Sequence, residues 1–444
     1  MTANPQDNLS ALYPAHLAEI EKRGTDALAA CSRDTLVVAA GQPHGWFLDD
    51  QDYPFKANPH FLAWLPLTDA PGSWIVYTPG SKPKLVFVQP HDYWHVVPAA
   101  PAGYWTRHFD IVTIRSPDAA RAHLPKDPSR CAIVGEANAA VGDVVPDNPE
   151  RLMHLLHYRR AFKTPYEITM MRTASKLGVH GHRAAEQAFR EGLSEFDIHC
   201  EYLKATRLAA HELPYGNIIA LDSHGAVLHY MHFDRNPPAH AHSFLIDAGG
   251  NFHGYASDIT RTYASPDAGE FQALIDALET AQQGFCARVR SGQSYPELHV
   301  HAHHVLTQAL SDQGFITCSP EAAIASGISA AFFPHGLGHL IGLQVHDVGG
   351  FARDEAGNTI PKPDGHPYLR LTRTLQPGMV TTIEPGLYFI DMLLDELKAR
   401  SAAKDVVWDK VDAFRKYGGI RIEDDVVCTE GDPVNLTREA FAAA

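Results

Sequence analysis

Residues 244–263, FLIDAGGNFHGYASDITRTY, decide the fold of the larger part of this chain. An apolar run ends at Asp247, a Gly-Gly-Asn segment follows, and a second β-like run contains Asp258. This pattern predicts two β segments around a turn. The two carboxylates lie eleven positions apart, one on each arm, so the hairpin can bring both to one rim. Taken alone, an Asp after an apolar strand is usually a turn former.

Three further segments carry the other candidate ligands. His339 lies in HGLGHLIGLQVHD (335–347), Glu384 in TTIEPGLYF (381–389) and Glu423 in GGIRIEDD (418–425). Together with the two aspartates they make four carboxylates and one imidazole, with a formal charge of −4 when all four acids are ionised. A buried cluster of this kind without metal would force several carboxylates to protonate. Two divalent cations about 3.5–4 Å apart would balance the charge and hold a hydroxide between them.

Ordinary structural explanations exist for the same residues. Glu384 precedes Pro385 and could be an edge or turn residue, because Pro cannot donate to a strand ladder. In a strand over 419–428, Arg421 and Glu423 share one face, which is most often a solvated ion pair. A histidine-rich helix face could bind metal, but we favour a solvent-facing role for it; its members are His299, His301, His303 and His304.

The chain divides near residue 160. Thr164, Pro165 and Glu167 form a capping box with Pro at the first helical position, which predicts a helix to about Arg190, ended by Gly192. Residues 1–160 predict an α/β domain, with a helix over 10–30 and strands over 35–41, 73–80, 84–90, 109–114 and 131–136. Residues 165–444 form the second domain, with another helix starting at Ser194, a helix over 295–311, a strand over 379–384 and a loop over 352–367.

Composition excludes several classes of protein. The 444 residues carry 37 Lys plus Arg against 52 Asp plus Glu, a net charge of −15, which disfavours nucleic acid and anionic membranes as partners. The start, MTANPQDNLS, has no signal-peptide pattern, and no apolar run approaches a membrane span. The six scattered cysteines are expected to be reduced core residues. We therefore expect a cytoplasmic enzyme. No pattern supports a Ser–His–Asp triad, a P-loop or a dinucleotide fingerprint.

The ordered set Asp, Asp, His, Glu, Glu resembles the "pita-bread" metallopeptidases, which include methionine aminopeptidase, aminopeptidase P and prolidase. The resemblance rests on long segments, 247–263, 332–351, 382–389 and 418–425. WFLDDQDYPFKANPHFLAWLPL (46–67) and PYGNIIALDSHGAVLHYMHFD (214–234) extend it, and are similar to bacterial Xaa-Pro dipeptidases of the organophosphorus acid anhydrolase type. It covers essentially the whole chain. It implies an α/β N-terminal domain and an α+β pita-bread (creatinase/aminopeptidase-like) catalytic domain.

The resemblance also implies roles for individual residues. Asp247 and Asp258 would bind one metal, and Asp258, His339, Glu384 and Glu423 the second. Mn²⁺ is expected because carboxylates favour hard cations, with Co²⁺ as a substitute in vitro. The other implied site residues are the catalytic histidines His335 and His346; the substrate-carboxylate clamp His229, Arg370 and Arg421; the pocket residues Tyr215, Tyr295 and Leu369; and Asp50, which reaches a neighbouring subunit's pocket and so implies a homodimer.

The implied reaction is hydrolysis of Xaa-Pro dipeptides. An Xaa-Pro bond has no N–H and populates cis as well as trans, so it needs a dedicated site. A metal-bridging hydroxide would attack the carbonyl, His346 would donate to the oxyanion, and Glu384 would carry the proton to the proline nitrogen. Aminopeptidase P, which acts on longer X-Pro peptides, is the main alternative. A non-catalytic pita-bread binding module is disfavoured because all five ligands are present. Hydrolysis of organophosphate triesters is a possible side reaction.

Overall fold

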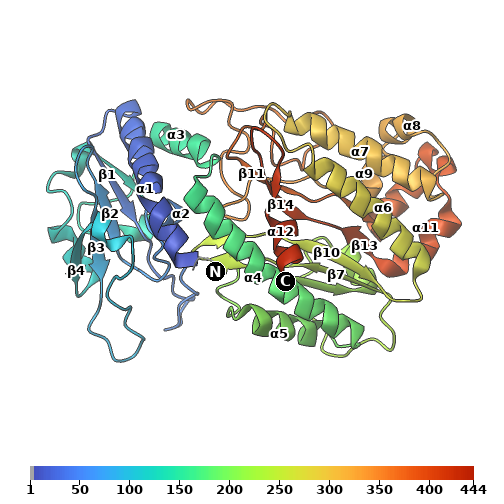
Figure 1. The fold of residues 1–444 in the computed structure, drawn as a ribbon, viewed down its shortest axis with the longest axis horizontal. Helices are drawn as coiled ribbons and strands as arrows, with labels where there is room; N and C mark the ends of the chain where they lie inside the picture. The colour runs from blue at the N-terminus through green and yellow to red at the C-terminus, as the bar shows by residue number, and fades with distance from the viewer. Residues whose placement is uncertain (1–4) are drawn as a thin grey trace. The chain divides into compact units, whose positions relative to one another are not determined.

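The computed structural model describes residues 5–444, which separate into two compact units (Figure 1). The first unit holds residues up to Met170 together with Ala352–Thr359, and the second holds Met171–Phe351 and Ile360–Ala444. The division falls inside helix α4 (Pro165–Arg190). The segment 352–359 comes from the loop expected over 352–367, and 352–367 contains no helix or strand.

The first unit is an α/β domain around one mixed sheet of five strands, in the order β4-β3-β2-β1-β5. Each predicted strand is present. The antiparallel pairs β1–β2 and β2–β3 continue into parallel pairs at both edges. Val37, Trp74, Val86 and Ile133 are among the buried residues of its core. The elements are α1 (Pro5–Ala30), β1 (Thr35–Ala39), α2 (Pro59–Leu62), β2 (Trp74–Tyr77), β3 (Lys84–Val88), β4 (Asp110–Ile114), β5 (Cys131–Val134) and α3 (Glu150–Arg160).

The predicted capping box is confirmed. The backbone N–H of Thr164 donates to Oε2 of Glu167 at 2.8 Å, and the N–H of Glu167 donates back to Thr164 Oγ1 at 3.4 Å. The helix ends at Arg190, and Gly192 follows with a φ of 77°, a conformation that glycine adopts without a steric penalty. Ser194 caps the next helix by accepting from the N–H of Asp197. Local sequence signals therefore set these boundaries.

The second unit has the mixed α+β architecture that the resemblance implied. Strands β10-β7-β6 form one sheet and β11-β14-β15 another, and a bridge between Thr260 and Glu423 joins them. Helix α5 packs on β6, and α6 packs on β10, β11 and β13 (Figure 1). The strands are β6 (Ile218–Leu221), β7 (Ser243–Asp247), β8 (Asn251–Phe252), β9 (Tyr255–Ala256), β10 (Thr260–Ala264), β11 (Val380–Ile383), β12 (Gly386–Tyr388), β13 (Gly419–Arg421), β14 (Asp424–Val427) and β15 (Val434–Asn435).

Nine α-helices lie wholly or partly in the described residues of this unit. Besides α4 they are α5 (Glu195–Thr206), α6 (Gly269–Cys286), α7 (Tyr295–Asp312), α8 (Pro320–Ala325), α9 (Ile328–Phe332), α10 (Asp391–Lys398), α11 (Trp408–Phe414) and α12 (Leu436–Ala443).

Among residues 5–444, no helix combines the length and the apolarity that a membrane crossing requires. All six cysteines are free, and three of them, Cys131, Cys286 and Cys428, are buried.

Three details of the sequence interpretation were wrong. The expected Gly-Gly-Asn turn is not the reversal: Asn251 pairs within a hairpin that turns at His253–Gly254. A Cβ on Gly249 would lie 1.9 Å from the Ser257 carbonyl oxygen, so the glycine serves close packing. The strand expected over 419–428 is two strands in different sheets, β13 and β14, and Glu423 lies in the break.

The third correction concerns helix α7. His299 and His303, which were expected to face solvent, are 1% and 3% exposed, whereas His301 and His304 are half-buried. The rings of Phe333 and His366 cover the first two, with ring centres 4.6–5.8 Å away. A four-residue spacing places two side chains on one helix face, but it does not say what packs there.

Candidate metal centre

The five predicted ligands come together in the second unit, where the ends of several strands meet. Asp247 ends β7 opposite Thr260 of β10, and Asp258 lies two residues before β10. Glu384 lies between β11 and β12, and Glu423 lies between β13 and β14. Because Pro385 and the break at Glu423 interrupt the ladders here, these side chains leave the sheets at a common edge. We call this group the carboxylate centre: Asp247, Asp258, His339, Glu384 and Glu423.

Distances within the carboxylate centre suit shared metal ions. Nε2 of His339 lies 3.5 Å from Oδ2 of Asp258 and 3.5 Å from Oε1 of Glu384. Ligand atoms of Asp258, His339 and Glu423 lie within 4.8 Å of one another, and all three residues are buried. Asp247 joins through Tyr215, whose hydroxyl lies 2.8 Å from Asp247 Oδ1 and 2.5 Å from Asp258 Oδ1. The donor set is oxygen-rich, which suits hard divalent cations.

Burial without metal makes this cluster electrostatically costly. Burial raises the pKa of Asp247 to about 6 and that of Glu384 to about 7. Burial also raises the pKa of Glu423 well above its usual range. Although burial opposes both charged forms, the contact between Asp258 and His339 lowers the pKa of Asp258 and raises that of His339. Cations would remove this penalty by balancing the carboxylates, so the residues present fit a metal pair.

Arg421 is the cation nearest to these acids. Its three nitrogens each donate to the centre or its support: Nη2 to Asp247 Oδ2 at 2.6 Å, Nη1 to the Tyr388 hydroxyl at 2.7 Å, and Nε to Thr260 Oγ1 at 3.1 Å. The guanidinium is 5% exposed. Arg421 therefore positions Asp247 in this structure, in addition to the substrate-clamp role expected for it.

Several supporting residues were not recognised in the sequence. Thr260 donates through its hydroxyl to Glu423 Oε2 at 2.7 Å, and Asp425 Oδ2 accepts from the N–H of Asp258 at 3.1 Å. The Tyr388 hydroxyl lies 2.9 Å from His335 Nε2. Such partners hold first ligands in orientation. The only sequence signal was their position near the ligands, in SDIT, IEDD and EPGLY.

Two neutral histidines flank the centre. The ring of His346 is perpendicular to that of His339, with centres 4.4 Å apart, and Nδ1 of His335 lies 3.7 Å from Glu384 Oε2. Burial lowers the pKa of His335 to about 3 and that of His346 to about 4. A neutral imidazole has one N–H to donate. His346 can therefore act as a hydrogen-bond donor near neutral pH, whereas His335 directs its N–H at the Gly336 carbonyl oxygen, 2.8 Å from Nδ1.

The expected substrate residues are placed less uniformly. His229 and Arg370 are exposed, and both contribute, after burial and His339, to the lowered pKa of His346. Tyr295 is buried with its hydroxyl on the Thr382 carbonyl oxygen, 2.9 Å away. Leu369 is buried, and its Cα would lie 3.0 Å from a Cβ on Gly336. Asp50 is an exposed residue of the first unit.

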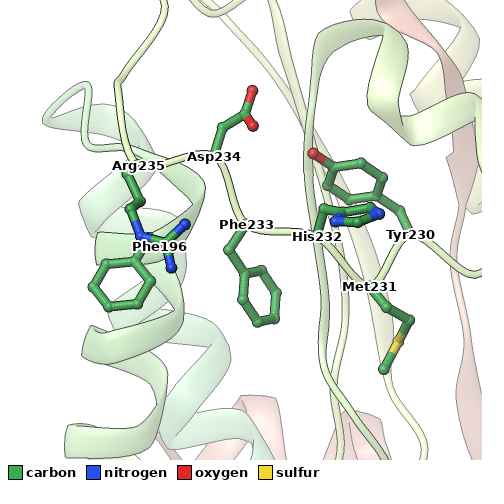
Figure 2. A pocket seen from close by; sticks show the side chains of 7 residues that line it. All are labelled: Phe196, Tyr230, Met231, His232, Phe233, Asp234 and Arg235. Atoms are coloured by element: carbon green, nitrogen blue, oxygen red, sulfur yellow. The ribbon is translucent and has the colours of Figure 1, made fainter.

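A cavity of about 550 Å³ opens in the segment that follows His229. Figure 2 shows its lining, in which the Arg235 guanidinium lies over the Phe196 ring, 5.5 Å from the ring centre. Buried Glu195 fixes the segment by accepting from the Tyr230 hydroxyl at 2.8 Å and from the N–H of Asp234 at 2.9 Å. No ligand of the carboxylate centre lines this cavity, so it is a separate recess. Its lining residues are Phe196, Tyr230, Met231, His232, Phe233, Asp234 and Arg235.

Comparison with known proteins agrees with this geometry. Residues 11–158 match the family model for the Xaa-Pro dipeptidase N-terminal domain, and residues 169–430 match metallopeptidase family M24. An Xaa-Pro dipeptidase of Xanthomonas campestris pv. campestris is 60% identical over 438 residues, 99% of each chain, and one of Stenotrophomonas maltophilia is 58% identical over 439 residues, also 99% of each chain.

Solved structures share the fold at lower identity. Aminopeptidase P from E. coli with the inhibitor Pro-Leu superposes with a TM-score of 0.70 at 24% identity, covering 96% of this chain and 97% of that one. Aminopeptidase PepP from Pseudomonas aeruginosa gives a TM-score of 0.67 at 23% identity, covering 96% and 98%. At this identity the similarity concerns the fold alone.

Proposed function

Given that this chain belongs to metallopeptidase family M24, as an Xaa-Pro dipeptidase, we propose that the carboxylate centre performs the hydrolysis with two Mn²⁺ ions and releases free proline. The observation that carries the proposal is the set of five ligands gathered around His339, with the pKa values of three carboxyl groups raised by burial. Carboxylate-dominated ligation favours Mn²⁺, with Co²⁺ as a substitute in vitro.

The chain's own residues would divide the work as follows. When bound, the two metal ions would supply a hydroxide at neutral pH and polarise the scissile carbonyl. His346, held neutral by burial, would donate its N–H to the developing oxyanion, a contribution of about 3–4 kcal/mol in comparable sites. Glu384 would take a proton and deliver it to the leaving proline nitrogen, since its carboxylate lies beside both His339 and His335.

Substrate selection would depend on a free carboxylate. Arg370 is exposed and close enough to act on His346 electrostatically, and so is His229. A guanidinium matches a carboxylate in planar geometry, so the pair would hold the proline carboxylate of a dipeptide. Arg421 would contribute through Asp247 and Tyr388, which it contacts directly. In a longer peptide the proline carbonyl is part of an amide, which has no negative charge to pair with Arg370. Tyr215, Tyr295 and Leu369 would shape the pocket.

The test compares Ala-Pro with Ala-Pro-Ala, each with Mn²⁺ and with EDTA. Metal-dependent cleavage of the dipeptide alone is expected. Cleavage of the tripeptide would instead indicate aminopeptidase P specificity, and cleavage of neither would indicate a non-catalytic binding role. Zn²⁺ and Co²⁺ in the same assay would rank the metals, with Mn²⁺ expected to give the highest turnover.

We also propose a cytoplasmic homodimer in which Asp50 reaches the neighbouring subunit's pocket. Phe47 and Leu48, both 91% exposed, lie beside Asp50 in the first unit. Apolar side chains this exposed mark interaction surfaces when they gather in a patch. Analytical ultracentrifugation should give a dimer mass, and Phe47→Ser with Leu48→Ser should shift it towards the monomer. A monomeric wild-type chain would contradict the proposal.

A side activity towards phosphotriesters follows from the same chemistry. A hydroxide between two metals can attack phosphorus as well as carbon. We expect an aryl dialkyl phosphotriester to be hydrolysed more slowly than Ala-Pro, with the same metal dependence. Persistence of that activity in a Glu423→Gln variant that has lost its metals would assign it to another site.

A further inference from the structure

Three histidines outside the carboxylate centre form a second cluster of metal-ligand type. His299 and His303 lie one turn apart on α7, and His366 comes from the loop that follows residue 360. Nε2 of His299 lies 2.9 Å from Nδ1 of His366, and one ring nitrogen from each residue lies within 4.8 Å of the others. We call these three residues the histidine cluster. The geometry is close to that of a three-histidine metal site.

Each ring has features that a metal ligand needs. Burial, and then the neighbouring imidazoles, lower the pKa of His299 to about 2 and that of His303 to about 3, so both rings are neutral at pH 7 and carry a free lone pair. Nδ1 of His303 lies 2.7 Å from Ser329 Oγ, the outer partner that fixes a ligating histidine and leaves Nε2 for the metal.

The cluster also has an unsatisfied atom. Nδ1 of His299 is buried and has no hydrogen-bond partner in the described residues, although His299 is 1% exposed. Buried polar groups are rarely left unpaired, so His299 is under-satisfied in this structure, and its other ring nitrogen, Nε2, is the one that faces His366. His299 Nε2 and His366 Nδ1, 2.9 Å apart, are close enough to share one proton. A metal ion is the group that replaces such a proton.

The cluster is separate from the carboxylate centre. The ring of Phe333 packs against His303 at 4.8 Å and against His335, which flanks the carboxylate centre, at 4.9 Å. None of the three ligands of the histidine cluster carries a charge at neutral pH. Imidazole-only sites suit Zn²⁺ and similar ions, whereas carboxylates suit Mn²⁺.

We propose that His299, His303 and His366 bind one Zn²⁺-class ion, which ties the loop of residues 361–370 to helix α7. Leu369 donates its N–H to the carbonyl oxygen of His366 at 3.3 Å, and Arg370 is the next residue. An ion on His366 would hold this turn in place. The metal site stands on the cluster alone; only its effect on Arg370 rests on the proposed function.

The test counts Zn²⁺ in full-length protein whose carboxylate centre has been disabled by Asp258→Asn with Glu423→Gln. After chelator treatment, Zn²⁺ loading and gel filtration, mass spectrometry of the metal should find about one ion per chain. Adding His366→Gln should remove it. His366 lies in a partly exposed loop, so this change should leave folding intact, which circular dichroism would verify.

Matched variants keep the outcome decisive. His301→Gln and His304→Gln lie on the same helix outside the cluster and should retain the ion. In the otherwise wild-type chain, His366→Gln should lower the Zn²⁺ content by about one ion. Zn²⁺ content unchanged by His366→Gln in both backgrounds would overturn the proposal. Neither count depends on dipeptidase activity, so failure here leaves the proposed function standing.

Discussion

The carboxylate centre and the histidine cluster lie in the same unit, both largely buried, but they meet the cost of burial in opposite ways. The carboxylate centre concentrates negative charge, and burial raises the pKa of three of its acids because the charged forms are poorly solvated. In the histidine cluster burial lowers the pKa of His299 and His303, so these groups are stable in neutral form. The first site needs cations to be ionised, whereas the second tolerates their absence.

This difference indicates different roles for the metals at the two sites. Three acids of the carboxylate centre are poorly stabilised in their ionised forms unless metal ions are bound, so these metals belong to the active form of the enzyme. A neutral imidazole site binds an ion without reorganising charge, which suits a structural clamp. Both sites depend on partners that hold the donors in place: Arg421, Thr260 and Asp425 for the carboxylates, and Ser329 for His303.

The largest expected effect comes from removing the acid of the carboxylate centre that faces His335. Glu384→Gln keeps the shape but cannot carry a proton, and general acid–base groups are worth about 10²–10⁴-fold in rate. We expect kcat to fall by at least about 10³-fold because a metal ligand is altered as well. Steady-state kinetics on Ala-Pro with parallel metal analysis measures this. Glu396→Gln, an exposed change on α10, is the control, and near-normal turnover in Glu384→Gln would exclude the assigned role.

Next in size is the pH dependence of the metal-free chain. Burial raises the pKa of Glu384 to about 7 in the folded chain, against an ordinary value of 4.5, so between these pH values the folded chain retains a proton that the unfolded chain releases. Raising the pH through this window therefore destabilises the metal-free fold, by about 2–3 kcal/mol for this group. Urea unfolding in EDTA at pH 5 and 7.5 should show the loss in wild type.

Two comparisons sharpen that experiment. Mn²⁺ should restore stability at pH 7.5, because ionised carboxylates are then paired with cations. Glu384→Gln should show a smaller loss between pH 5 and 7.5 than wild type. Equal losses in wild type and variant would show that Glu384 is not protonated in the metal-free fold.

The histidine cluster should give a slope of opposite sign. His303 has a folded pKa of about 3 against 6.5 unfolded, so below pH 6.5 the unfolded chain binds a proton that the folded chain does not. Lowering the pH from 6.5 to 5 should therefore cost about 2 kcal/mol of stability in the metal-free chain. Urea unfolding of His303→Gln should show a shallower dependence than wild type, while His304→Gln should match wild type. A steeper dependence in His303→Gln would contradict the neutral-cluster interpretation.

The smallest expected effect on catalysis comes from Tyr388, which is not a candidate metal ligand but contacts residues beside the carboxylate centre. Tyr388→Phe removes the hydroxyl between His335 Nε2 and Arg421 Nη1, and the loss of such hydrogen bonds costs about 1 kcal/mol. We expect kcat/KM for Ala-Pro to fall about five- to tenfold with metal content unchanged. Tyr417→Phe, whose ring stacks on Phe271 at 4.3 Å, makes the same chemical change elsewhere and should leave kcat/KM near wild type. A loss of metal in Tyr388→Phe would show instead that the hydroxyl supports ligation.

The sequence predicted which five candidate ligands lie together, because each is beside a strand end or a Gly or Pro, within a segment long enough to be specific. The capping box at Thr164 could also be predicted, since its partners lie three residues apart. The contacts that support the candidate ligands could not be predicted. Asp425 accepts from Asp258, 167 positions away, and only the pairing of separate sheets brings them together.

The histidine cluster shows the same limit. The spacing of His299 and His303 indicates a shared helix face, but its burial depends on Phe333, Ser329 and His366, which come from later segments. Likewise the period of two residues in 419–428 indicated one continuous strand, whereas a switch between sheets at Glu423 is a tertiary feature. Local periodicity therefore predicted which side chains share a face of a helix or strand, but it did not predict what packs against that face.

Whether a negatively charged site and a neutral site select different metals is tested most directly by one crystal of the full-length chain grown with Mn²⁺ and Zn²⁺. Anomalous maps at the two absorption edges would locate each metal. The account predicts a Mn²⁺ pair about 3.5–4 Å apart among Asp247, Asp258, His339, Glu384 and Glu423, and a Zn²⁺ peak among His299, His303 and His366. Zn²⁺ filling the carboxylate centre, with no peak at the histidines, would contradict it.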